Sequence, residues 1–292
     1  MFVAVLLTDP ARPHLTPAHA APLQAAWAGG PLRWLAPGEA AEFPLPAEPA
    51  DLWDRWAALQ AEGVDLAVLP AANRRKRLLL ADMDSTIIRQ ECIDELADEA
   101  GIGAEIAAIT ARTMNGELAF EPALRERVAL LAGLDAGVID RVMRERITYT
   151  PGGRRLVATM SAHGARCVLV SGGFTAFTGP VAAHLGFHAH RANLLETADG
   201  RLKGTVAEPI LGRAAKLTAL QELTAENNLT AEDVIAIGDG ANDLAMLGAA
   251  GMGVALHAKP VVAAECRLRI NHGDLTAALY LQGYARGDFA PE

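Results

Sequence analysis

Cysteine is scarce in this sequence, long apolar segments are absent, and basic residues do not outnumber acidic ones. The three cysteines, Cys92, Cys167 and Cys266, are far apart and odd in number, so they predict neither a disulfide framework nor a metal site of paired thiols. This use of cysteine is typical of a cytoplasmic protein. No run of about 18 uncharged apolar residues occurs, so nothing predicts a membrane-spanning transporter.

The charge balance is acidic. The 292 residues include 35 Asp and Glu against 26 Lys and Arg, a formal net charge of -9. Sequence-independent binding to nucleic acid is disfavoured, because a phosphate backbone attracts cations. A small anionic substrate would need a locally basic pocket. The opening MFVAVLLTDP has no basic segment before its apolar run, which Asp9 and Pro10 end, so we expect a strand there.

The first part of the chain, residues 2 to about 70, alternates between strand and helix patterns. Its predicted order is strand, helix, strand, strand, helix, strand. That order is typical of a ferredoxin-like α+β module, which occurs in small-molecule-sensing domains and in purely structural ones. We therefore expect a small domain over residues 1–72. The basic segment ANRRKR that follows is interpreted as a solvated linker.

From Arg77 onward, three apolar runs each lead into small or polar residues: RLLLADMD, CVLVSGG and VIAIGDG. Such runs are typical of buried parallel strands whose carboxyl ends open into a site. The pattern predicts a doubly wound, Rossmann-like α/β core, in a second domain over residues 73–292.

Two further segments complete the predicted architecture. Residues from about 91 to 150 have a helical pattern, so we expect a helical cap inserted after the first core strand, able to exclude water and to select the substrate. In NLLETADGRLKGTVA, the pair Asp199-Gly200 between two extended runs predicts a hairpin.

Asp82 and Asp84 stand two residues apart in DMDST, directly after the first apolar run. Paired carboxylates there can hold a divalent cation and divide attack and proton transfer between them. Acidic pairs are also common in turns, and only the whole DMDST after a strand is specific. We expect Ser85 and Thr86 to start the next helix, whose free backbone N–H groups could hold phosphate.

Three other segments accompany DMDST in a fixed order: VSGGF, GRAAKL and GDGANDL. Together the four motifs resemble those of the haloacid dehalogenase superfamily, and within it the phosphoserine phosphatase family, over residues from about 75 to 285. The residues that carry the resemblance in these segments are Ser171, Lys216, Asp239, Asn242 and Asp243.

The resemblance implies a magnesium-dependent phosphatase. In such an enzyme Asp82 attacks phosphorus and forms an aspartyl phosphate, while Asp84 donates a proton to the leaving oxygen and later accepts one from water. Lys216 neutralises the charge on the transferred group. Mg²⁺ is held by the carboxylates of Asp82 and Asp239 and the backbone carbonyl of Asp84, with Asp243 supporting this set.

The resemblance also implies a substrate, O-phospho-L-serine, whose hydrolysis is the final step of serine synthesis in this family. Glu91 would receive its ammonium group and Arg127 its carboxylate, for which a guanidinium fork is suited. Met114 and Phe120 would close the pocket around the side chain. The phosphoryl group would be bound by Ser171, by the amide of Gly172 and by Asn242.

Each motif has an ordinary structural alternative. The Ser171-Gly172-Gly173 segment could be a tight turn, Asp239-Gly240 a loop, and Lys216, Glu91 and Arg127 solvated helix residues. Two other functions remain open: a phosphotransferase, or a phosphatase for another small amino compound such as phosphohomoserine, and an idle protein that senses amino acids through its first domain. The intact catalytic motifs count against an idle protein.

Other features are assigned no function. His184, His188 and His190 lack the spacing of a metal pair, and GMGVALHAKP is interpreted as a strand with a turn rather than a phosphate loop. Gly212 precedes Arg213 where relatives more often have an acidic residue, which leaves the start of that helix open. The first domain resembles an amino-acid-sensing ACT domain in element order, so a homodimer or a regulatory role through it is left open.

Overall fold

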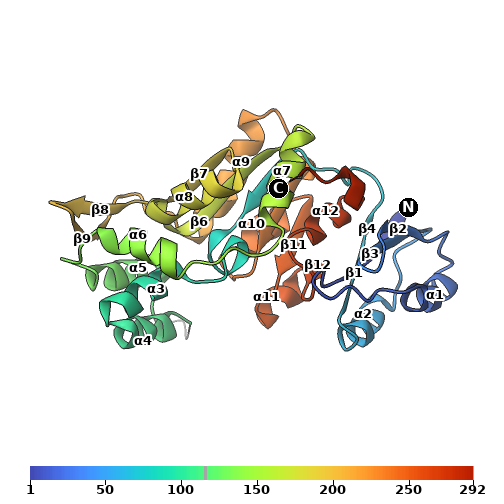
Figure 1. Ribbon diagram of the computed structural model, residues 1–292, viewed down its shortest axis with the longest axis horizontal. Coiled ribbons are helices and arrows are strands. Elements are labelled where there is room, and N and C mark those ends of the chain that lie inside the picture. The colour runs from blue at the N-terminus through green and yellow to red at the C-terminus, as the bar shows by residue number, and fades with distance from the viewer. Residues whose placement is uncertain (115–116, 292) are drawn as a thin grey trace.

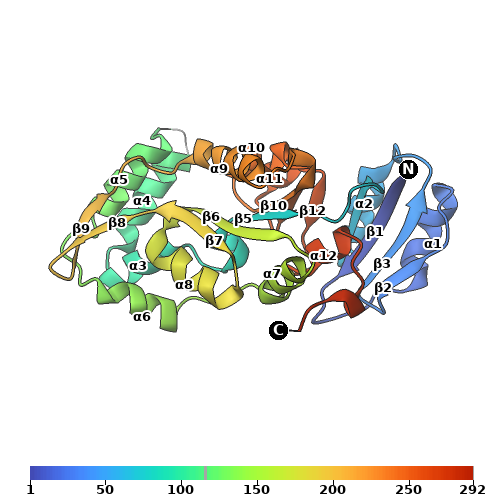
Figure 2. The same cartoon turned by 90° about the horizontal axis from the view of Figure 1, so that it is seen from above.

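The computed structural model describes residues 1–114 and 117–291 (Figure 1). These residues form an antiparallel sheet of four strands, a parallel sheet of six strands and a separate hairpin. The three parts follow one another along the long axis of the molecule, with the antiparallel sheet at one end and a group of helices at the other (Figures 1 and 2).

The antiparallel sheet has the predicted order strand, helix, strand, strand, helix, strand. Its strands pair in the spatial order β2-β3-β1-β4, that of a ferredoxin-like module. The elements are β1 (Phe2–Thr8), α1 (Pro17–Ala26), β2 (Arg33–Ala36), β3 (Ala40–Leu45), α2 (Leu52–Gln60) and β4 (Val64–Pro70). The ferredoxin-like prediction for the fold of this region is therefore confirmed.

Both faces of this sheet are buried. On β1, Ala4 and Leu6 pack with α1 and α2, whereas Val3, Val5 and Leu7 belong to the apolar cluster that continues into the rest of the protein. Neighbouring residues of a strand point to opposite faces. The unbroken apolar sequence of β1 is thus explained by contact with helices on one side and with the parallel-sheet core on the other.

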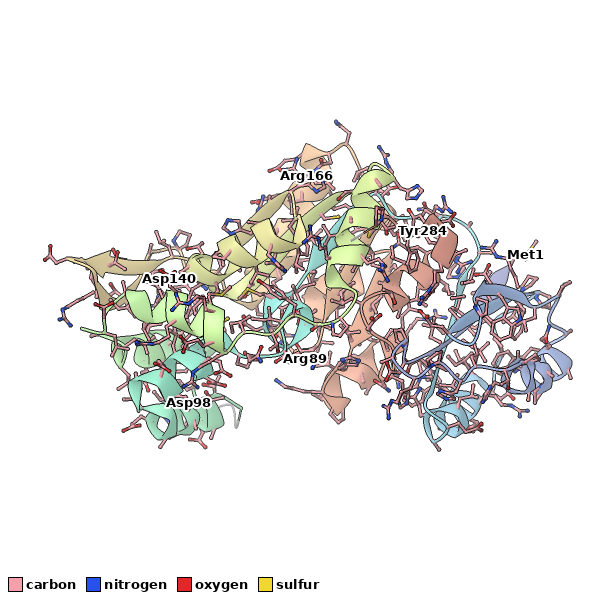
Figure 3. All side chains as sticks on the ribbon, in the orientation of Figure 1. Met1, Arg89, Asp98, Asp140, Arg166 and Tyr284 are labelled. Atoms are coloured by element: carbon pink, nitrogen blue, oxygen red, sulfur yellow. The ribbon has the colours of Figure 1, made fainter. Side chains whose placement is uncertain are left out.

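The parallel sheet contains the three strands expected from the apolar runs. Its strand order is β12-β11-β10-β5-β6-β7, so β10, β5 and β6 are adjacent and their carboxyl ends meet at one edge. In Figure 3, Arg166 marks the amino end of β6, and Arg89 lies toward the opposite edge. The strands are β5 (Leu78–Ala81), β6 (Arg166–Phe174), β7 (Ala189–Asn193), β10 (Val234–Gly238), β11 (Met252–Leu256) and β12 (Leu268–Ile270).

Helices cover both faces of the parallel sheet, as the doubly wound prediction requires (Figure 2). Leu78 and Leu80 of β5 pack with the helices of one face, and Leu79 with those of the other. One layer comprises α7 (Gly153–Ala162), α8 (Thr175–Leu185) and α12 (Ala277–Leu281). The other comprises α9 (Arg213–Glu226), α10 (Leu244–Ala249) and α11 (Pro260–Glu265), and two short turns are η2 (Ala231–Asp233) and η3 (Arg286–Asp288).

The segment after β5 is helical, as expected for a cap. Its helices are α3 (Cys92–Ala100), α4 (Gly103–Met114), α5 (Phe120–Ala129) and α6 (Gly137–Glu145), preceded by the short turn η1 (Met83–Ile87). The predicted hairpin pairs β8 (Leu195–Ala198) with β9 (Arg201–Val206) through Asp199 and Gly200, which both have positive φ. The amide of Gly133 donates to the carbonyl of Leu202 (2.8 Å), so the hairpin packs against the cap.

The interpretation of the basic segment between β4 and β5 as a solvated linker is wrong for two of its residues, Arg74 and Lys76. Arg74 pairs with Glu42 of β3 (2.8 Å) and also donates to the carbonyls of Tyr280 and Leu281. Lys76 is buried and its Nζ donates to the carbonyl of Glu232 (2.6 Å). Acceptors distant in the chain replace water around both cations, and sequence spacing does not reveal these partners.

Candidate active site

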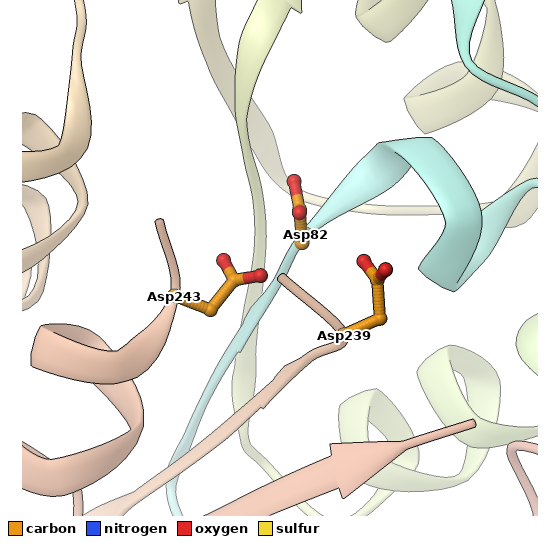
Figure 4. Close-up of side chains that lie close together, drawn as sticks. All are labelled: Asp82, Asp239 and Asp243. Atoms are coloured by element: carbon orange, nitrogen blue, oxygen red, sulfur yellow. The ribbon is translucent and has the colours of Figure 1, made fainter. Parts of the chain in front are cut away.

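Three buried carboxylates meet at the carboxyl edge of the parallel sheet. Asp82 follows β5, Asp239 follows β10, and Asp243 directly precedes α10. One oxygen from each lies within 4.8 Å of the others. Figure 4 shows the side chain of Asp82, after β5, close to those of Asp239 and Asp243, which lie between β10 and α10. The expected meeting of the first and last motifs is thereby observed.

Lys216 completes this group from α9. The helix begins at Arg213 after Gly212, which answers the question left open by the sequence. The Nζ atom of Lys216 lies 2.6 Å from Asp82 Oδ1 and donates to Asp243 Oδ1, also at 2.6 Å. Burial alone would lower the pKa of Lys216, but the two carboxylates raise it above its ordinary value, so the amine is held as a cation.

The carboxylate group fits a divalent cation. Burial, and after it the charge of Asp243, raises the pKa of both Asp82 and Asp239, so a bound cation would favour their ionised forms. Hard divalent cations bind carboxylate oxygens of this kind. The oxygens of Asp243 are engaged by Lys216 and by the amide of Gly240 (3.0 Å), which suits this residue to a supporting position.

The turn after Asp82 corrects one prediction. Ser85 and Thr86 do not start a helix: Asp84 is extended (ψ 136°) and Ser85 has φ 54°, and the next α-helix begins only at Cys92. The amide of Ser85 donates to the carbonyl of Gln90 (3.2 Å) and is used within the turn. A polar run after a strand predicts the start of a helix. Here the chain first makes a turn, which places Asp84 next to Ser171 at the end of β6.

Thr86 has a different place from the one expected. Its side chain is buried, and Oγ1 donates to Asp239 Oδ1 at 3.3 Å. It thus links the turn after β5 to the carboxylate that follows β10. In the sequence, only the position of Thr86 next to Asp82 and Asp84 indicates that it lies near the site.

Asp84 is held in place by two elements. Its Oδ1 accepts a hydrogen bond from the amide of Cys92 at the start of α3 (2.8 Å), and its Oδ2 accepts one from Ser171 Oγ at the end of β6 (3.0 Å). A side chain at Gly173 would place Cβ 2.8 Å from Asp84 Oδ2. The glycine therefore permits the close approach of β6 to this carboxylate.

A cavity of about 490 Å³ opens beside these groups, between the sheet edge and the cap. Of the residues that the sequence assigns to the site, its walls include Asp82, Asp84, Glu91, Phe120, Arg127, Gly172, Asp239 and Asn242. Ser171 is buried and is not part of the wall, but its hydroxyl donates a hydrogen bond to Asp84, which is. Met114 is the last residue of α4, and its side chain lies outside the part of the chain that the structure describes.

Two charged cap residues face this cavity. Glu91 lies on its exposed rim, where its carboxylate accepts a hydrogen bond from Ser85 Oγ (2.8 Å). Displacement of water by the surrounding protein, together with the charge of Asp84, raises the pKa of Glu91 to about 7. Arg127 is half-buried on α5, where its Nε donates to the carbonyl of Ala123 (3.3 Å), and burial lowers its pKa.

Phe120 connects the cap to the core. It is the first residue of α5, and a Cβ built on Gly172 at the end of β6 would lie 3.3 Å from its ring. The aromatic ring therefore lies in the cavity wall beside the strand end, and its contact with a substrate stays a prediction.

Sequence reasoning missed several wall residues, above all Lys259. It belongs to GMGVALHAKP, which does form the predicted strand, β11, followed by a turn at His257 (φ 46°). Yet Lys259 lines the cavity together with the apolar residues Ile93, Leu124 and Val261. A lone lysine before a short helix carries no sequence signal for such a position.

The three discounted histidines make structural contacts. The ring of His184 stacks on Tyr149, His188 Nδ1 accepts from the amide of Cys167 (3.0 Å), and His190 Nδ1 lies 2.8 Å from Thr178 Oγ1. Within residues 1–114 and 117–291, the cluster of Asp82, Asp239 and Asp243 is the group of three or more His, Cys, Asp or Glu side chains whose ligand atoms lie close enough to share a metal ion.

Residues 79–248 match the family model of haloacid dehalogenase-like hydrolases. The chain belongs to this family. The matched segment runs from β5 to α10 and so contains the cap and the aspartate cluster. None of the helices in the described part of the chain has the length and apolar character to cross a membrane.

Two curated relatives of the chain are named phosphoserine phosphatase. It is 46% identical over 228 residues to a phosphoserine phosphatase of Streptomyces coelicolor, an alignment that covers 77% of this chain and 55% of the relative. It is 44% identical over 210 residues to one of Polaromonas sp., covering 70% and 89%. The chain therefore spans about half the length of the Streptomyces coelicolor relative, and most of the length of the Polaromonas one.

Solved structures agree in fold. A HAD family hydrolase of Salmonella enterica serovar Typhi has TM-score 0.87 and 29% identity over 96% of this chain and 97% of that one. A probable phosphoserine phosphatase of Vibrio cholerae has TM-score 0.80 and 30% identity over 98% and 88%. A phospho-aspartyl intermediate analogue of phosphoserine phosphatase, at TM-score 0.65 and 36% identity, covers 70% of this chain and 98% of that one.

Proposed function

We propose that this protein hydrolyses O-phospho-L-serine to L-serine and phosphate, through an aspartyl phosphate formed on Asp82. One observation carries the proposal: a single cavity is bordered by Asp82 and Asp84 at the sheet edge and by Glu91 and Arg127 on the cap side. A phosphate-handling pair thus faces two charges opposite in sign to the ammonium and carboxylate of an amino acid. The names of the relatives support the same substrate.

We propose Asp82 Oδ2 as the attacking atom. Oδ1 accepts from the amide of Met83 (2.7 Å) and contacts Lys216, and these contacts orient the carboxylate. As the bond from Oδ2 to phosphorus forms, the bond from phosphorus to the seryl oxygen breaks. Lys216, held as a cation, would stabilise the negative charge that spreads over the phosphoryl oxygens.

Asp84 would serve both half-reactions as the proton carrier. Held by the amide of Cys92 and the hydroxyl of Ser171, its carboxyl would give a proton to the departing seryl oxygen. In the second half-reaction it would take a proton from the water that attacks phosphorus. The bond between phosphorus and Asp82 then breaks, which releases phosphate and restores the carboxylate of Asp82 and the protonated carboxyl of Asp84.

We propose Mg²⁺ as the cation of the aspartate cluster. The carboxylates of Asp82 and Asp239 and the backbone carbonyl of Asp84 would hold it, and Asp243 would support them through Lys216 and Gly240. When bound, the ion would neutralise charge on the phosphoryl oxygens. The buried oxygens of the cluster match the ligands that Mg²⁺ prefers.

Substrate selection is assigned to the cap. Glu91 would bind the ammonium group and Arg127 the carboxylate, while Phe120 and Met114 enclose the short side chain. On the core side, Ser171, the amide of Gly172 and Asn242 would bind the phosphoryl oxygens. A substrate one methylene longer, such as phosphohomoserine, would not place both charged groups and phosphorus correctly at once.

The protein is also proposed to have two domains and a cytoplasmic location. We propose an ACT-like domain over residues 1–72 and a phosphatase domain over residues 73–292, with its cap at about 91–150. A cytoplasmic location is supported by three cysteines that are buried and unpaired. A homodimer through the N-terminal domain stays a prediction, and the acidic net charge supports a small-molecule substrate rather than nucleic acid as partner.

A phosphate-release screen with Mg²⁺ tests the function. The panel contains phosphoserine, phosphohomoserine and p-nitrophenyl phosphate. We expect the highest kcat/KM for phosphoserine, with little release from phosphohomoserine. A preference for phosphohomoserine would indicate a phosphatase for that compound. Phosphate transfer to an added alcohol in place of water would indicate a phosphotransferase. Either result would contradict the proposal.

A further inference from the structure

The cavity beside Asp82 has more acidic than basic side chains in its wall. Among the described residues that line it, the carboxylates are Asp82, Asp84, Glu91 and Asp239, and the cations are Arg127 and Lys259. A phosphomonoester carries up to two negative charges on its phosphate near neutral pH. Beside the cation proposed for the aspartate cluster, a positively charged side chain at the entrance would favour its entry past these carboxylates.

Two cations of the site are committed elsewhere. Lys216 is buried, with its Nζ between Asp82 and Asp243, and it does not belong to the cavity wall. Arg127 lies half-buried on the cap, where the proposed function gives it the substrate carboxylate. Lys259 is the exposed cation of the core side of this wall.

The backbone fixes where Lys259 stands. Its amide donates to the carbonyl of Asp239 (3.3 Å), so the residue is tied directly to the metal-binding loop. Two residues earlier, the amide of His257 donates to the carbonyl of Ile270 (2.7 Å), and its Nε2 lies 2.8 Å from the carbonyl oxygen of Gly273. Pro260 then starts α11. A short anchored segment thus presents the side chain at the cavity.

The charge of Lys259 reaches both sides of the cavity. Lys259 lines the same cavity wall as Glu91 on the cap side and Asp239 on the core side. A phosphate that enters between these two carboxylates therefore passes through the cavity that Lys259 also lines, where the charge of the ammonium attracts it.

We infer that Lys259 is a substrate-binding residue, whose exposed ammonium attracts the phosphate group of the substrate into the acidic cavity. The inference rests on the proposed function only in requiring a phosphomonoester. It assigns Lys259 a role beyond the motifs of Asp82, Ser171, Lys216 and Asp239. Such a charge acts chiefly on capture of the substrate, and salt screens its effect.

The test compares Lys259→Met, Lys259→Gln and Lys259→Arg with the full-length wild-type enzyme. Arg213→Met is the matched control, because Arg213 is an exposed cation on α9 outside the wall of this cavity. For each protein, kcat and kcat/KM are measured with phosphoserine and with p-nitrophenyl phosphate, at salt concentrations from about 20 to about 300 mM. Circular dichroism establishes that each variant is folded.

We expect the Met and Gln variants to lose about tenfold in kcat/KM at low salt, with a smaller change in kcat and a flatter salt dependence. The Arg variant keeps most of the activity, and the Arg213 control follows wild type. Equal kcat/KM for Lys259→Met and wild type, or an equal loss in the Arg213 control, overturns the inference. If wild type hydrolyses only the aryl phosphate, the proposed function fails, while the comparison of Lys259 variants can still be read on that substrate.

Discussion

The carboxylate of Asp65, on β4 of the N-terminal sheet, accepts a hydrogen bond from the backbone amide of Gly273 in the loop after β12 (2.9 Å). The amides of Asn271 and His272 donate to the same fully buried carboxylate, each at 2.9 Å. Further along this loop, the amide of Leu275 donates to the carbonyl of Pro151, at the junction between cap and core (3.1 Å). The N-terminal domain thus holds a loop that contacts the base of the cap.

Asp65→Asn is expected to destabilise the protein by about 1–3 kcal/mol, because an amide cannot accept on both sides and leaves a buried N–H without its partner. Thermal or urea unfolding measures the change. The control is Asp54→Asn, at an exposed position of α2, which should alter stability by less than about 0.5 kcal/mol. Equal stability of Asp65→Asn and wild type would show that the three amides do not depend on the charge.

Asp82→Asn should abolish turnover, because it removes the proposed nucleophile while changing little volume. Steady-state phosphate release measures the loss, and circular dichroism should show a fold near that of wild type. Full activity in this variant would remove covalent catalysis by Asp82 from the mechanism.

Arg127→Ala should raise KM for phosphoserine far more than KM for p-nitrophenyl phosphate, since only the former has a carboxylate to pair with the guanidinium. Arg125→Ala is the matched control: Arg125 lies on the same helix but is exposed and pairs with Glu208 (2.7 Å) outside the cavity wall. Steady-state kinetics on both substrates gives the comparison. An equal rise in KM for both would defeat the assignment of Arg127 to the substrate carboxylate.

The raised pKa of Glu91, about 7, predicts a pH dependence of substrate binding. Below pH 7 the carboxylate is increasingly protonated and loses its charge for the ammonium, so KM for phosphoserine should rise as pH falls. With this pKa only about a tenth of Glu91 is ionised at pH 6, so KM should be about tenfold higher at pH 6 than well above pH 7, where Glu91 is fully ionised. The aryl phosphate, which lacks an ammonium, corrects for titration of the phosphate itself. A Glu91→Gln variant with the same ratio of KM values across pH as wild type would exclude Glu91 as the titrating group.

Removal of divalent cations with EDTA should stop phosphate release, and added Mg²⁺ should restore it. The cation should also raise the unfolding temperature, because it offsets repulsion among three buried carboxylates and binds only the folded state. Calorimetry with and without Mg²⁺ gives this second readout. An Asp239→Asn variant should lose most of the stabilisation. Unchanged activity in EDTA would contradict a metal-dependent reaction.

Much of this architecture could be predicted from local patterns. The apolar runs before Asp82, Ser171 and Asp239 predict buried parallel strands, because such a strand must be apolar along its whole length, and the structure shows that the three strands are adjacent. The order of elements in the first 70 residues predicts a ferredoxin-like sheet, and Asp199-Gly200 predicts the hairpin. The cavity wall includes Glu91 and Arg127 as expected, although their roles still await measurement.

The sequence alone determined the motifs, their order along the chain and the strands that carry them, because side-chain periodicity and turn chemistry act over a few residues. Only the tertiary structure decided that Ser85 lies in a tight turn, that Lys76 is buried and that Lys259 faces the cavity. Each of these depends on groups distant in the chain: the sheet edge that Asp84 must reach, the carbonyl of Glu232, and the loop of Asp239. Local sequence patterns do not predict such partners, because these groups come together only when the chain folds.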